Sequence, residues 1–185
     1  MITASIVLYN ENLETLKKTV DSFLKTPLPK KLYLIDNSSE NLLEESFKHS
    51  EIVYIFVAGN IGFGKAHNLV LGKINSVFHL ILNPDVEFNS DVIPNLIKAL
   101  EDKPSVSFIT PKVIYPNKEN QFICRKHPTF FDLINRKLKI SRTQIVKKEY
   151  RNQDLQKPFY PEFIHGCFML FRTTDFKYLN GFDNR

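Results

Sequence analysis

The segment that most clearly suggests chemistry is a glycine-rich turn, Gly59-Asn60-Ile61-Gly62-Phe63-Gly64-Lys65. Backbone amides at the start of a helix attract anions, and Lys65 adds a positive charge, so this segment could bind phosphate. Its G-x-x-G-x-G spacing matches neither the dinucleotide-binding G-x-G-x-x-G motif nor a P-loop. A tight turn with a helix cap is the alternative interpretation.

Glycine is otherwise rare in this chain. Average usage of about 7% predicts about 13 glycines in a chain of this length. The 185 residues contain six, and three of them fall within residues 59–64. This clustering indicates that the backbone there adopts a conformation that other residues avoid.

Two carboxylates that follow expected strands could supply a second kind of chemistry. Asp85, in Asn83-Pro84-Asp85, could hold a divalent cation that neutralises a diphosphate, and Glu87 could assist it. Asp36 ends another strand, and its ionised carboxylate could accept hydrogen bonds from a base N–H or from ribose hydroxyls. The structural alternatives are an ordinary turn at 83–85 and an Asx turn after Asp36.

Aromatic and histidine side chains offer fewer clues. Tyr9 could stack on a base, or it could pack at the rim of the core. His165, which precedes Gly166, could contact a substrate. His67 and His79 are expected to pack inside the protein or to face solvent.

The elements that must position these residues alternate between strands and helices. The expected strands are 4–8, 32–35, 52–57, 77–82 and 106–109, and the helices between them span about 13–24, 42–48, 65–73 and 91–101. The strands are nearly continuous apolar runs, which is typical of a parallel sheet covered on both faces. Ligands of such sheets bind beyond the carboxyl ends of the strands. The polar residues expected at that edge are Tyr9, Asn10, Asp36, Asn37, Asn60 and Asp85.

The pattern changes after residue 110. A hairpin of residues 112–115 and 121–125 is expected around Pro116-Asn117-Lys118. A strand at 166–171 and a short helix at 173–179 are expected much later in the chain. Between them, residues 136–151 contain seven Lys or Arg residues and one acid, which predicts a basic loop.

Composition excludes several classes of protein. The sequence contains no run of about 18 apolar residues, so no transmembrane helix is expected. The N-terminus lacks the features of a signal peptide. Cys124 and Cys167 are too few for a disulfide framework or a four-ligand zinc site, so a cytoplasmic setting is expected. The net charge of +5 suits an anionic partner such as a nucleotide, a membrane surface or nucleic acid.

Taken together, seven segments resemble the family 2 inverting glycosyltransferases, and among them the bacterial rhamnosyltransferase-like branch. Their order and spacing extend across essentially the whole chain. The segments are Ile6-Val7-Leu8-Tyr9-Asn10, Leu34-Ile35-Asp36-Asn37-Ser38-Ser39, Asn60-Ile61-Gly62-Phe63-Gly64-Lys65-Ala66-His67-Asn68, Leu82-Asn83-Pro84-Asp85, Thr110-Pro111-Lys112, Gly166-Cys167-Phe168-Met169-Leu170-Phe171-Arg172 and Gly181-Phe182-Asp183.

The resemblance implies an α/β architecture of the GT-A type, a Rossmann-like fold with a mostly parallel sheet and helices on both faces. Residues 1–185 would form one incomplete catalytic domain, with a nucleotide-sugar-binding half at 1–110 and an acceptor-side half at 111–185. The implied reaction transfers a sugar, with rhamnose as one candidate, from a nucleotide diphosphate donor with inversion. The acceptor would be a saccharide or a lipid-linked molecule in cell-surface polysaccharide synthesis, and the cofactor Mg2+ or Mn2+.

Site residues also follow from the resemblance. Asp85 matches the last aspartate of the metal-binding D-x-D-type motif, and Asn83 replaces its first acid. His165 and Gly166 would border the acceptor. The implied donor-binding residues are Tyr9, Asn10, Asp36, Asn60, Gly62, Gly64, Lys65, Asn68 and Asn83.

The sequence departs from the family pattern at two places. Leu8 stands where the family often has threonine, which affects one donor contact. In the family, an acidic Glu-Asp motif that supplies the catalytic base follows the Gly-Phe-Asp segment. The present sequence ends at Arg185, so the base is expected beyond that residue.

Three alternatives remain. The chain could be a donor-binding but inactive fragment. A nucleotidyltransferase of similar fold would carry a glycine-rich, arginine-containing loop after the first strand, where this chain has Tyr9-Asn10-Glu11-Asn12. Nucleic-acid binding would rest on residues 136–151, which lack a regular aromatic platform, so no nucleic-acid partner is expected. That segment could instead contact anionic lipids, which would place the protein at the inner face of the membrane.

Overall fold

The computed structural model describes residues 1–127 and 149–183. The chain forms two compact units, one made of residues 1–111 and 166–185 and the other of residues 112–165. The expected halves 1–110 and 111–185 differ from this division in one respect. Residues 166–185 return to the first unit, because they contain a strand that pairs within its sheet.

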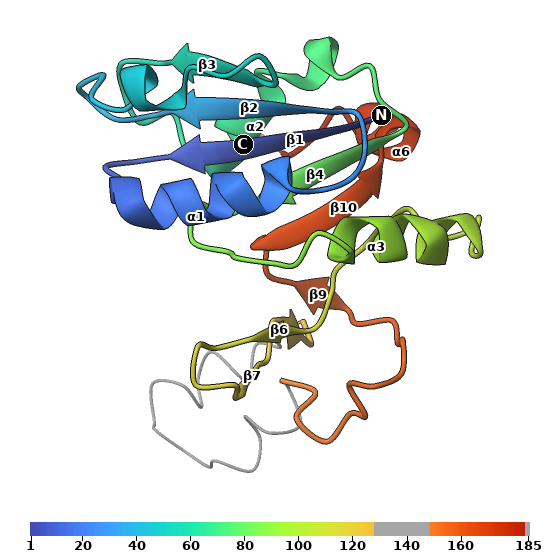
Figure 1. Ribbon diagram of the computed structural model, residues 1–185. Coiled ribbons are helices and arrows are strands. Elements are labelled where there is room, and N and C mark those ends of the chain that lie inside the picture. Colours follow the sequence, from blue (N-terminus) through green and yellow to red (C-terminus); the bar gives the residue numbers. More distant parts are fainter. Residues whose placement is uncertain (128–148, 184–185) are drawn as a thin grey trace. The chain divides into compact units, whose positions relative to one another are not determined.

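The first unit is built on a six-stranded sheet with the order β3-β2-β1-β4-β10-β5 (Figure 1). Strands β1 to β4 pair in parallel, and β10 runs antiparallel to both of its neighbours. The sheet is therefore mostly parallel, as expected. Its strands are β1 (Ile2–Leu8), β2 (Lys30–Asp36), β3 (Ile52–Phe56), β4 (Phe78–Leu82), β5 (Phe108–Ile109) and β10 (Phe168–Arg172).

Helices connect these strands. They are α1 (Leu13–Leu24), α2 (Phe63–Asn68), α3 (Val92–Glu101) and α6 (Thr173–Tyr178), with 3-10 turns at η1 (Glu44–Phe47) and η2 (Leu71–Lys73). The helix expected at 65–73 is shorter than predicted and separate from η2. Gly72 lies in this stretch, and glycine is a poor helix former. The helix expected at 42–48 is a single 3-10 turn.

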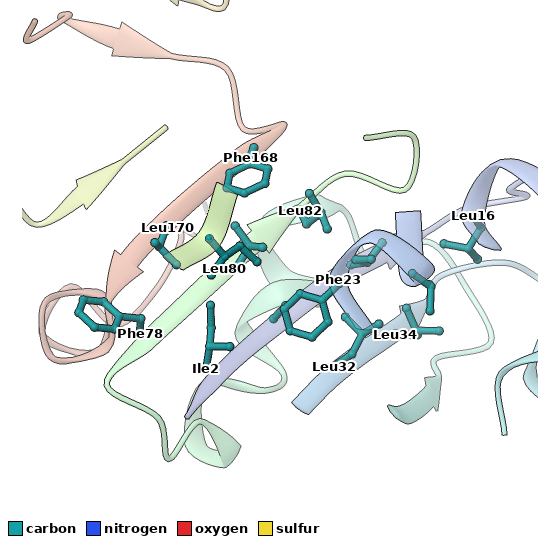
Figure 2. Packing of buried hydrophobic residues seen from close by; sticks show 14 of the residues in the cluster. Ile2, Leu16, Phe23, Leu32, Leu34, Phe78, Leu80, Leu82, Phe168 and Leu170 are labelled. Atoms are coloured by element: carbon teal, nitrogen blue, oxygen red, sulfur yellow. The ribbon is translucent and has the colours of Figure 1, made fainter. Parts of the chain in front are cut away.

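The sheet is covered by helices on both faces. On one face, alternate residues of β1 pack with Leu16, Val20 and Phe23 of α1 and with residues of α3. Figure 2 shows Phe23 beside Leu32 and Leu34 of β2. On the other face, α2, η2 and α6 cover the sheet in two smaller clusters. Each fully buried Leu or Phe side chain stabilises this core by about 1.5–3 kcal/mol.

Helix α1 begins with a clear capping signal. The Asn12 side-chain oxygen accepts hydrogen bonds from the amides of Glu14 and Thr15 at 3.0 and 3.1 Å. Such a cap stabilises a helix by about 1 kcal/mol, because it pairs amides that have no partner within the helix. The cap fixes where α1 starts, directly after the loop that follows β1.

The second unit contains two short strand pairs. Strands β6 (Val113–Ile114) and β7 (Asn120–Gln121) form a hairpin around the expected turn. Its second strand is shorter than the expected 121–125, because Cys124–Arg125 form a separate strand, β8, that pairs with β9 (Phe163–Ile164). Most of the expected basic loop at 136–151 lies outside the described residues. In its described part, Glu149 forms ion pairs with Arg125 and Arg151.

In the part of the chain that the structure describes, no helix has both the length and the apolar character required to cross a bilayer.

Candidate active site

The carboxyl ends of four parallel strands lie at one edge of the sheet in the first unit. Leu8 of β1 is level with Asp36 of β2, which is level with Phe56 of β3, and β4 follows the same direction. Because β10 is antiparallel, its start lies at this edge too, and the Asn83 amide donates to the Cys167 carbonyl at 2.9 Å. The structure thus brings together the loops that were expected to carry the site.

The residues expected to bind the donor differ in accessibility. The Tyr9 side chain is exposed (52%), as are those of Asn10, Asn60, Lys65 and Asp85. The exposed set also includes Gly62, whereas Gly64, Asn68 and Asn83 are half-buried. Asp36 is fully buried.

The loops at this edge are joined by hydrogen bonds. The Asn10 amide donates to Ser38 Oγ at 2.9 Å, and Asn10 itself adopts a positive φ of 55°. Asn37 Nδ2 donates to the Gly62 carbonyl at 3.4 Å. The loop after β2 therefore contacts both the loop after β1 and the glycine-rich turn.

The glycine-rich turn has a defined backbone conformation. Gly62 has a φ of 88°, which side-chain-bearing residues rarely adopt, and its amide donates to Asn60 Oδ1 at 2.9 Å. The Asn60 side chain thus closes the turn. This is the tight-turn interpretation, and it leaves Lys65 exposed to solvent.

Asp36 is held by two donors. Its Oδ1 accepts from the Ser38 amide at 2.9 Å, which is the bond of an Asx turn, and its Oδ2 accepts from Tyr54 Oη at 2.5 Å. Burial, together with the hydrogen bond to Asp36 and the negative charge of that residue, raises the pKa of Tyr54. The carboxylate therefore fixes the loop that contains Ser38. Direct binding of a base by Asp36 stays a prediction.

Asp85 lies in the turn after β4, exposed to solvent. Its negative charge acts on Glu11, whose pKa is raised mainly by burial and further by Asp85, against a hydrogen bond with the Tyr9 backbone that lowers it. Glu87, by contrast, forms a surface ion pair with Lys18 at 4.0 Å. Glu87 was expected to assist Asp85, but the carboxyl group that interacts with Asp85 is that of Glu11. The sequence offered one sign of this role for Glu11, which directly follows Tyr9 and Asn10 in the loop after β1.

The turn that carries Asp85 is supported from helix α1. Thr19 is fully buried, and its Oγ1 donates to the Pro84 carbonyl at 2.8 Å. This contact links residues 65 positions apart in the sequence. The sequence pattern does not indicate it, because Thr19 looks like any small residue on the buried side of a helix.

Asn68 binds the backbone near the end of the first unit. Its Nδ2 donates to the Phe182 carbonyl at 2.8 Å, and its Oδ1 accepts from the Phe182 amide at 2.9 Å. Gly181 has a φ of 75°, and a Cβ atom there would lie 2.1 Å from Asn68 Oδ1. A Cβ atom at Gly64 would lie 2.9 Å from Phe182 Cβ, so the glycine-rich turn and the Gly181-Phe182-Asp183 segment are in close contact.

The two residues expected at the acceptor side belong to different units. Gly166 is part of the first unit, where a Cβ atom would contact Met169 and Phe63 at 3.4 and 3.5 Å. His165 is part of the second unit, where its Nε2 accepts from Arg125 Nε at 3.3 Å. Their acceptor role stays a prediction.

Comparison with known proteins identifies relatives for this arrangement. The profile of the family described as glycosyl transferase family 2 matches residues 3–179. The rhamnosyltransferase WbbL of Escherichia coli K12 is 24% identical over 188 residues, covering 96% of this chain and 69% of the relative. The low-salt glycan biosynthesis hexosyltransferase Agl10 of Haloferax volcanii is 32% identical over 85 residues, covering 44% of this chain and 27% of the relative.

Solved structures of similar fold include the mannosyltransferase PcManGT of Pyrobaculum calidifontis in complex with GDP-Man and Mn2+, with a TM-score of 0.65 and 16% identity. It is matched over 99% of this chain and 47% of its own length. S. aureus TarS has a TM-score of 0.62 at 18% identity and is matched over 100% of this chain and 51% of its own. The chain thus spans about half of these structures.

The predicted fold and the resemblance are confirmed, because the sequence profile and the sheet topology agree. Since the match extends over residues 3–179, the chain belongs to glycosyl transferase family 2.

Proposed function

We propose that this chain binds a nucleotide diphosphate sugar and provides the donor half of an inverting glycosyl transfer to a saccharide or lipid-linked acceptor. The observation that supports this best is the set of exposed side chains at the carboxyl edge of β1 to β4. Tyr9 and Asp85 are exposed there on two loops, and Lys65 is exposed in α2 directly after the glycine-rich turn; hydrogen bonds hold these segments in place. They are an aromatic ring, a cation and a carboxylate, which suit a base, a diphosphate and a metal ion.

Each side chain has a defined role in this proposal. The exposed ring of Tyr9 stacks on the nucleotide base, and the neighbouring Asn10 hydrogen bonds to the nucleoside. Lys65 pairs with the diphosphate, beside the positive-φ backbone of Gly62. Helix α2 has only six residues, so this interaction rests on the Lys65 charge rather than on a long helix dipole.

The residues around Asp85 fit a hard divalent cation. Mg2+ and Mn2+ prefer oxygen ligands, and Asp85, the Asn83 amide oxygen and the diphosphate supply them. The negative charge of Asp85 also acts on Glu11, and two neighbouring carboxyl groups favour a cation. When bound, the cation would stabilise the negative charge that develops on the departing diphosphate. Both ions suit this set of oxygen ligands.

Inversion also requires a base that removes the proton from the acceptor hydroxyl. From the family resemblance, we propose that this base follows the Gly181-Phe182-Asp183 segment. Asn68 holds that segment through two hydrogen bonds to Phe182, and the absence of a side chain at Gly64 lets the segment lie against the glycine-rich turn, where the donor diphosphate is proposed to bind. A chain that binds donor without catalysing transfer is the second candidate.

Calorimetric titration with nucleotide diphosphate sugars, with Mn2+ or with a chelator, tests the donor and metal site. Asp85→Asn should weaken Mn2+-dependent binding at least tenfold, because the proposed ligand loses its charge. Glu87→Gln is the matched control, because Glu87 pairs with Lys18 at the surface, and should bind as the wild type does. Equal binding by the Asp85→Asn variant would contradict the metal assignment.

The sugar is addressed by a thermal-shift panel. The relatives are named for rhamnose, hexose and mannose transfer, and one TarS structure contains UDP-GlcNAc. We favour dTDP-rhamnose, and the panel should include UDP-GlcNAc and GDP-mannose. A ligand that binds only the folded state raises the melting temperature. A transfer assay on this chain and on a C-terminally longer one separates the active enzyme from the inactive donor-binding form.

Association of residues 136–151 with anionic lipids, and hence a position at the inner face of the membrane, is a separate proposal. It rests on the charge of this segment, which contains seven Lys or Arg residues. Flotation with liposomes of increasing anionic lipid content should recover increasing amounts of protein. Recovery that does not depend on the anionic lipid would contradict it.

A further inference from the structure

Five polar side chains form a continuous hydrogen-bonded row inside the first unit. Thr3, Ser5 and His79 lie on the face of the sheet that α2 and α6 cover, opposite α1, because they alternate along β1 and β4 with the residues of the main core. Ser76 precedes β4, and His67 belongs to α2. All are buried. In order along the row, they are Ser76, Thr3, His79, Ser5 and His67.

The direction of this row is set at its first member. Ser76 Oγ donates its single proton to the Phe78 carbonyl at 2.7 Å, because a carbonyl can only accept. Ser76 Oγ must therefore accept from Thr3 Oγ1, which lies 2.6 Å away. Thr3 Oγ1, having donated its proton, accepts in turn from His79 Nδ1 at 2.8 Å.

The same reasoning continues through the second half of the row. A neutral His79 that is protonated on Nδ1 has a bare Nε2, which accepts from Ser5 Oγ at 3.0 Å. Ser5 Oγ then accepts from His67 Nδ1 at 2.7 Å. Both imidazoles are thus protonated on Nδ1, and His67 Nε2 is a bare acceptor. It has no hydrogen-bond partner within the described part of the protein.

Both imidazoles are neutral at physiological pH. Burial lowers the pKa of His67 to about 3. Burial, and then repulsion from the protonated form of His67, lower the pKa of His79 to about 3 as well. Neutral imidazoles are the form that this order of donors and acceptors requires.

The Ser5–His67 pair resembles the nucleophile and base of a hydrolase, but it has no access to substrate. Both side chains have an exposed fraction of 0%. An effect of the pair on the site would therefore have to act through the elements that the pair joins. Ser5 belongs to β1 in the centre of the sheet, and His67 belongs to α2.

Helix α2 needs such an attachment. A helix of six residues is not stable in isolation, because the cost of nucleation exceeds the gain from so few hydrogen bonds. Ala66 and His67 are its buried residues. The bond from His67 Nδ1 fixes the orientation of the imidazole, whose ring packs edge-on against Phe63 with centroids 4.4 Å apart. Phe63 directly follows Gly62 and precedes Gly64 and Lys65.

We propose that His67 is a positioning residue: through its hydrogen bond to Ser5, it fixes α2 and thereby the place of the glycine-rich turn and Lys65 against the donor diphosphate. This inference rests on the proposed function of the turn. Because the Ser5 end of the bond lies in the central strand, the sheet sets the position of a diphosphate-binding loop at its edge.

The experiment compares variants that break the row at different places. Ser5→Ala removes the acceptor of His67 without changing α2, and His67→Phe keeps a ring but loses the donor. His67→Asn retains a donor at the position of Nδ1. Thr3→Val is the matched control, because it breaks the row one step before His79 and leaves the Ser5–His67 bond.

Two measurements are made on each variant. Calorimetry should give a donor dissociation constant that rises five- to tenfold for Ser5→Ala and His67→Phe, is partly restored in His67→Asn and is unchanged for Thr3→Val. Amide hydrogen exchange over residues 63–68 should accelerate at least tenfold in the first two variants only. If His67 had a purely structural role, the dissociation constant would be unchanged in Ser5→Ala, as in Thr3→Val.

The outcomes separate the two proposals. If the wild type binds donor and Ser5→Ala binds it equally well, the positioning role is wrong while the donor site stands. If the wild type binds no nucleotide sugar, the proposed function fails. Nitrogen–proton correlation spectra of the histidine rings still test the row, because both His67 and His79 should be protonated on Nδ1. A His67 protonated on Nε2 would overturn the inferred direction.

Discussion

Tyr54 Oη donates a hydrogen bond of 2.5 Å to Asp36 Oδ2 across two neighbouring parallel strands. Tyr54 of β3 pairs with Leu34 of β2, and Asp36 lies two residues after Leu34 on the same strand. Because side chains alternate between the faces of a sheet, those of Tyr54 and Asp36 lie on the same face. The second oxygen of Asp36 holds the Ser38 amide, and Ser38 Oγ in turn accepts from the Asn10 amide. A tyrosine on β3 is thereby linked to the loop beside Tyr9.

Tyr54→Phe should lower stability by about 1–3 kcal/mol, because it leaves one oxygen of a buried carboxylate without its donor. Urea unfolding measures this loss. Tyr33→Phe is the control, because Tyr33 Oη donates to the Lys73 carbonyl at 3.1 Å and no charged partner is left behind. The Tyr54 variant should lose more stability than the Tyr33 variant. An equal or smaller loss would contradict the importance of the Asp36 pair.

Acidification should destabilise the fold through the two buried histidines. The pKa of His67 and that of His79 are lowered to about 3 in the folded state, compared with about 6.5 in the unfolded chain. At pH values between these two pKa values, the histidines are protonated in the unfolded chain but not in the folded state. The free energy of unfolding therefore falls as the pH falls below about 6.5. From pH 7 to pH 5 the loss should be about 2 kcal/mol for each histidine.

Unfolding free energies at several pH values measure this dependence. A variant with His67→Asn and His79→Asn should have a flatter profile over the same range, whatever its stability at pH 7. His49→Asn changes an exposed histidine and should keep the wild-type slope. A double variant with the wild-type slope would show that other groups cause the acid sensitivity.

The sequence predicted most of this sheet, and the reason is local. Buried parallel strands are continuous apolar runs, so β1 to β4 and the polar residues after them could be placed by pattern alone. The boundaries of α2 were predicted less well. Its six residues are held by tertiary contacts through Ala66 and His67, which periodicity does not reveal.

The chemistry of individual side chains was harder to predict, because it depends on distant partners. His67 and His79 were expected to pack or to face solvent, yet their hydrogen bonds reach Ser5 and Thr3 from 62 to 76 positions away in the sequence. Asp36 was expected to accept hydrogen bonds from a ligand, and its hydrogen bond from Tyr54 could not be predicted. Such pairs arise from strand register, which the sequence alone does not fix.

Thr19→Val should weaken metal-dependent donor binding about three- to tenfold. The substitution keeps the shape of the side chain but removes the hydroxyl that holds the Pro84 carbonyl, and Asp85 is the next residue. Thr19→Ser retains the hydroxyl and should bind more tightly than Thr19→Val. Calorimetry with and without Mn2+ measures both. If the two variants bind donor equally, the bond to Pro84 does not position Asp85.

Asn68 and Gly181 should show strong coupling in a double-mutant cycle. Gly181→Ala is strained twice, because the residue has a φ of 75° and its new Cβ would lie 2.1 Å from Asn68 Oδ1. Asn68→Ala removes that atom together with two hydrogen bonds to Phe182. In the Asn68→Ala background, Gly181→Ala should therefore cost only the backbone strain, about 1–2 kcal/mol.

In the wild-type background, the same Gly181→Ala change should cost at least 1 kcal/mol more, so the two substitutions should be less than additive. Urea unfolding of the four proteins in the cycle measures the coupling energy. Gly72→Ala serves as a control, because a Cβ atom at Gly72 would meet no atom within 4 Å and should not be coupled to Asn68. Additive effects of Asn68→Ala and Gly181→Ala would mean that the amide of Asn68 does not hold the Gly181-Phe182-Asp183 segment in place.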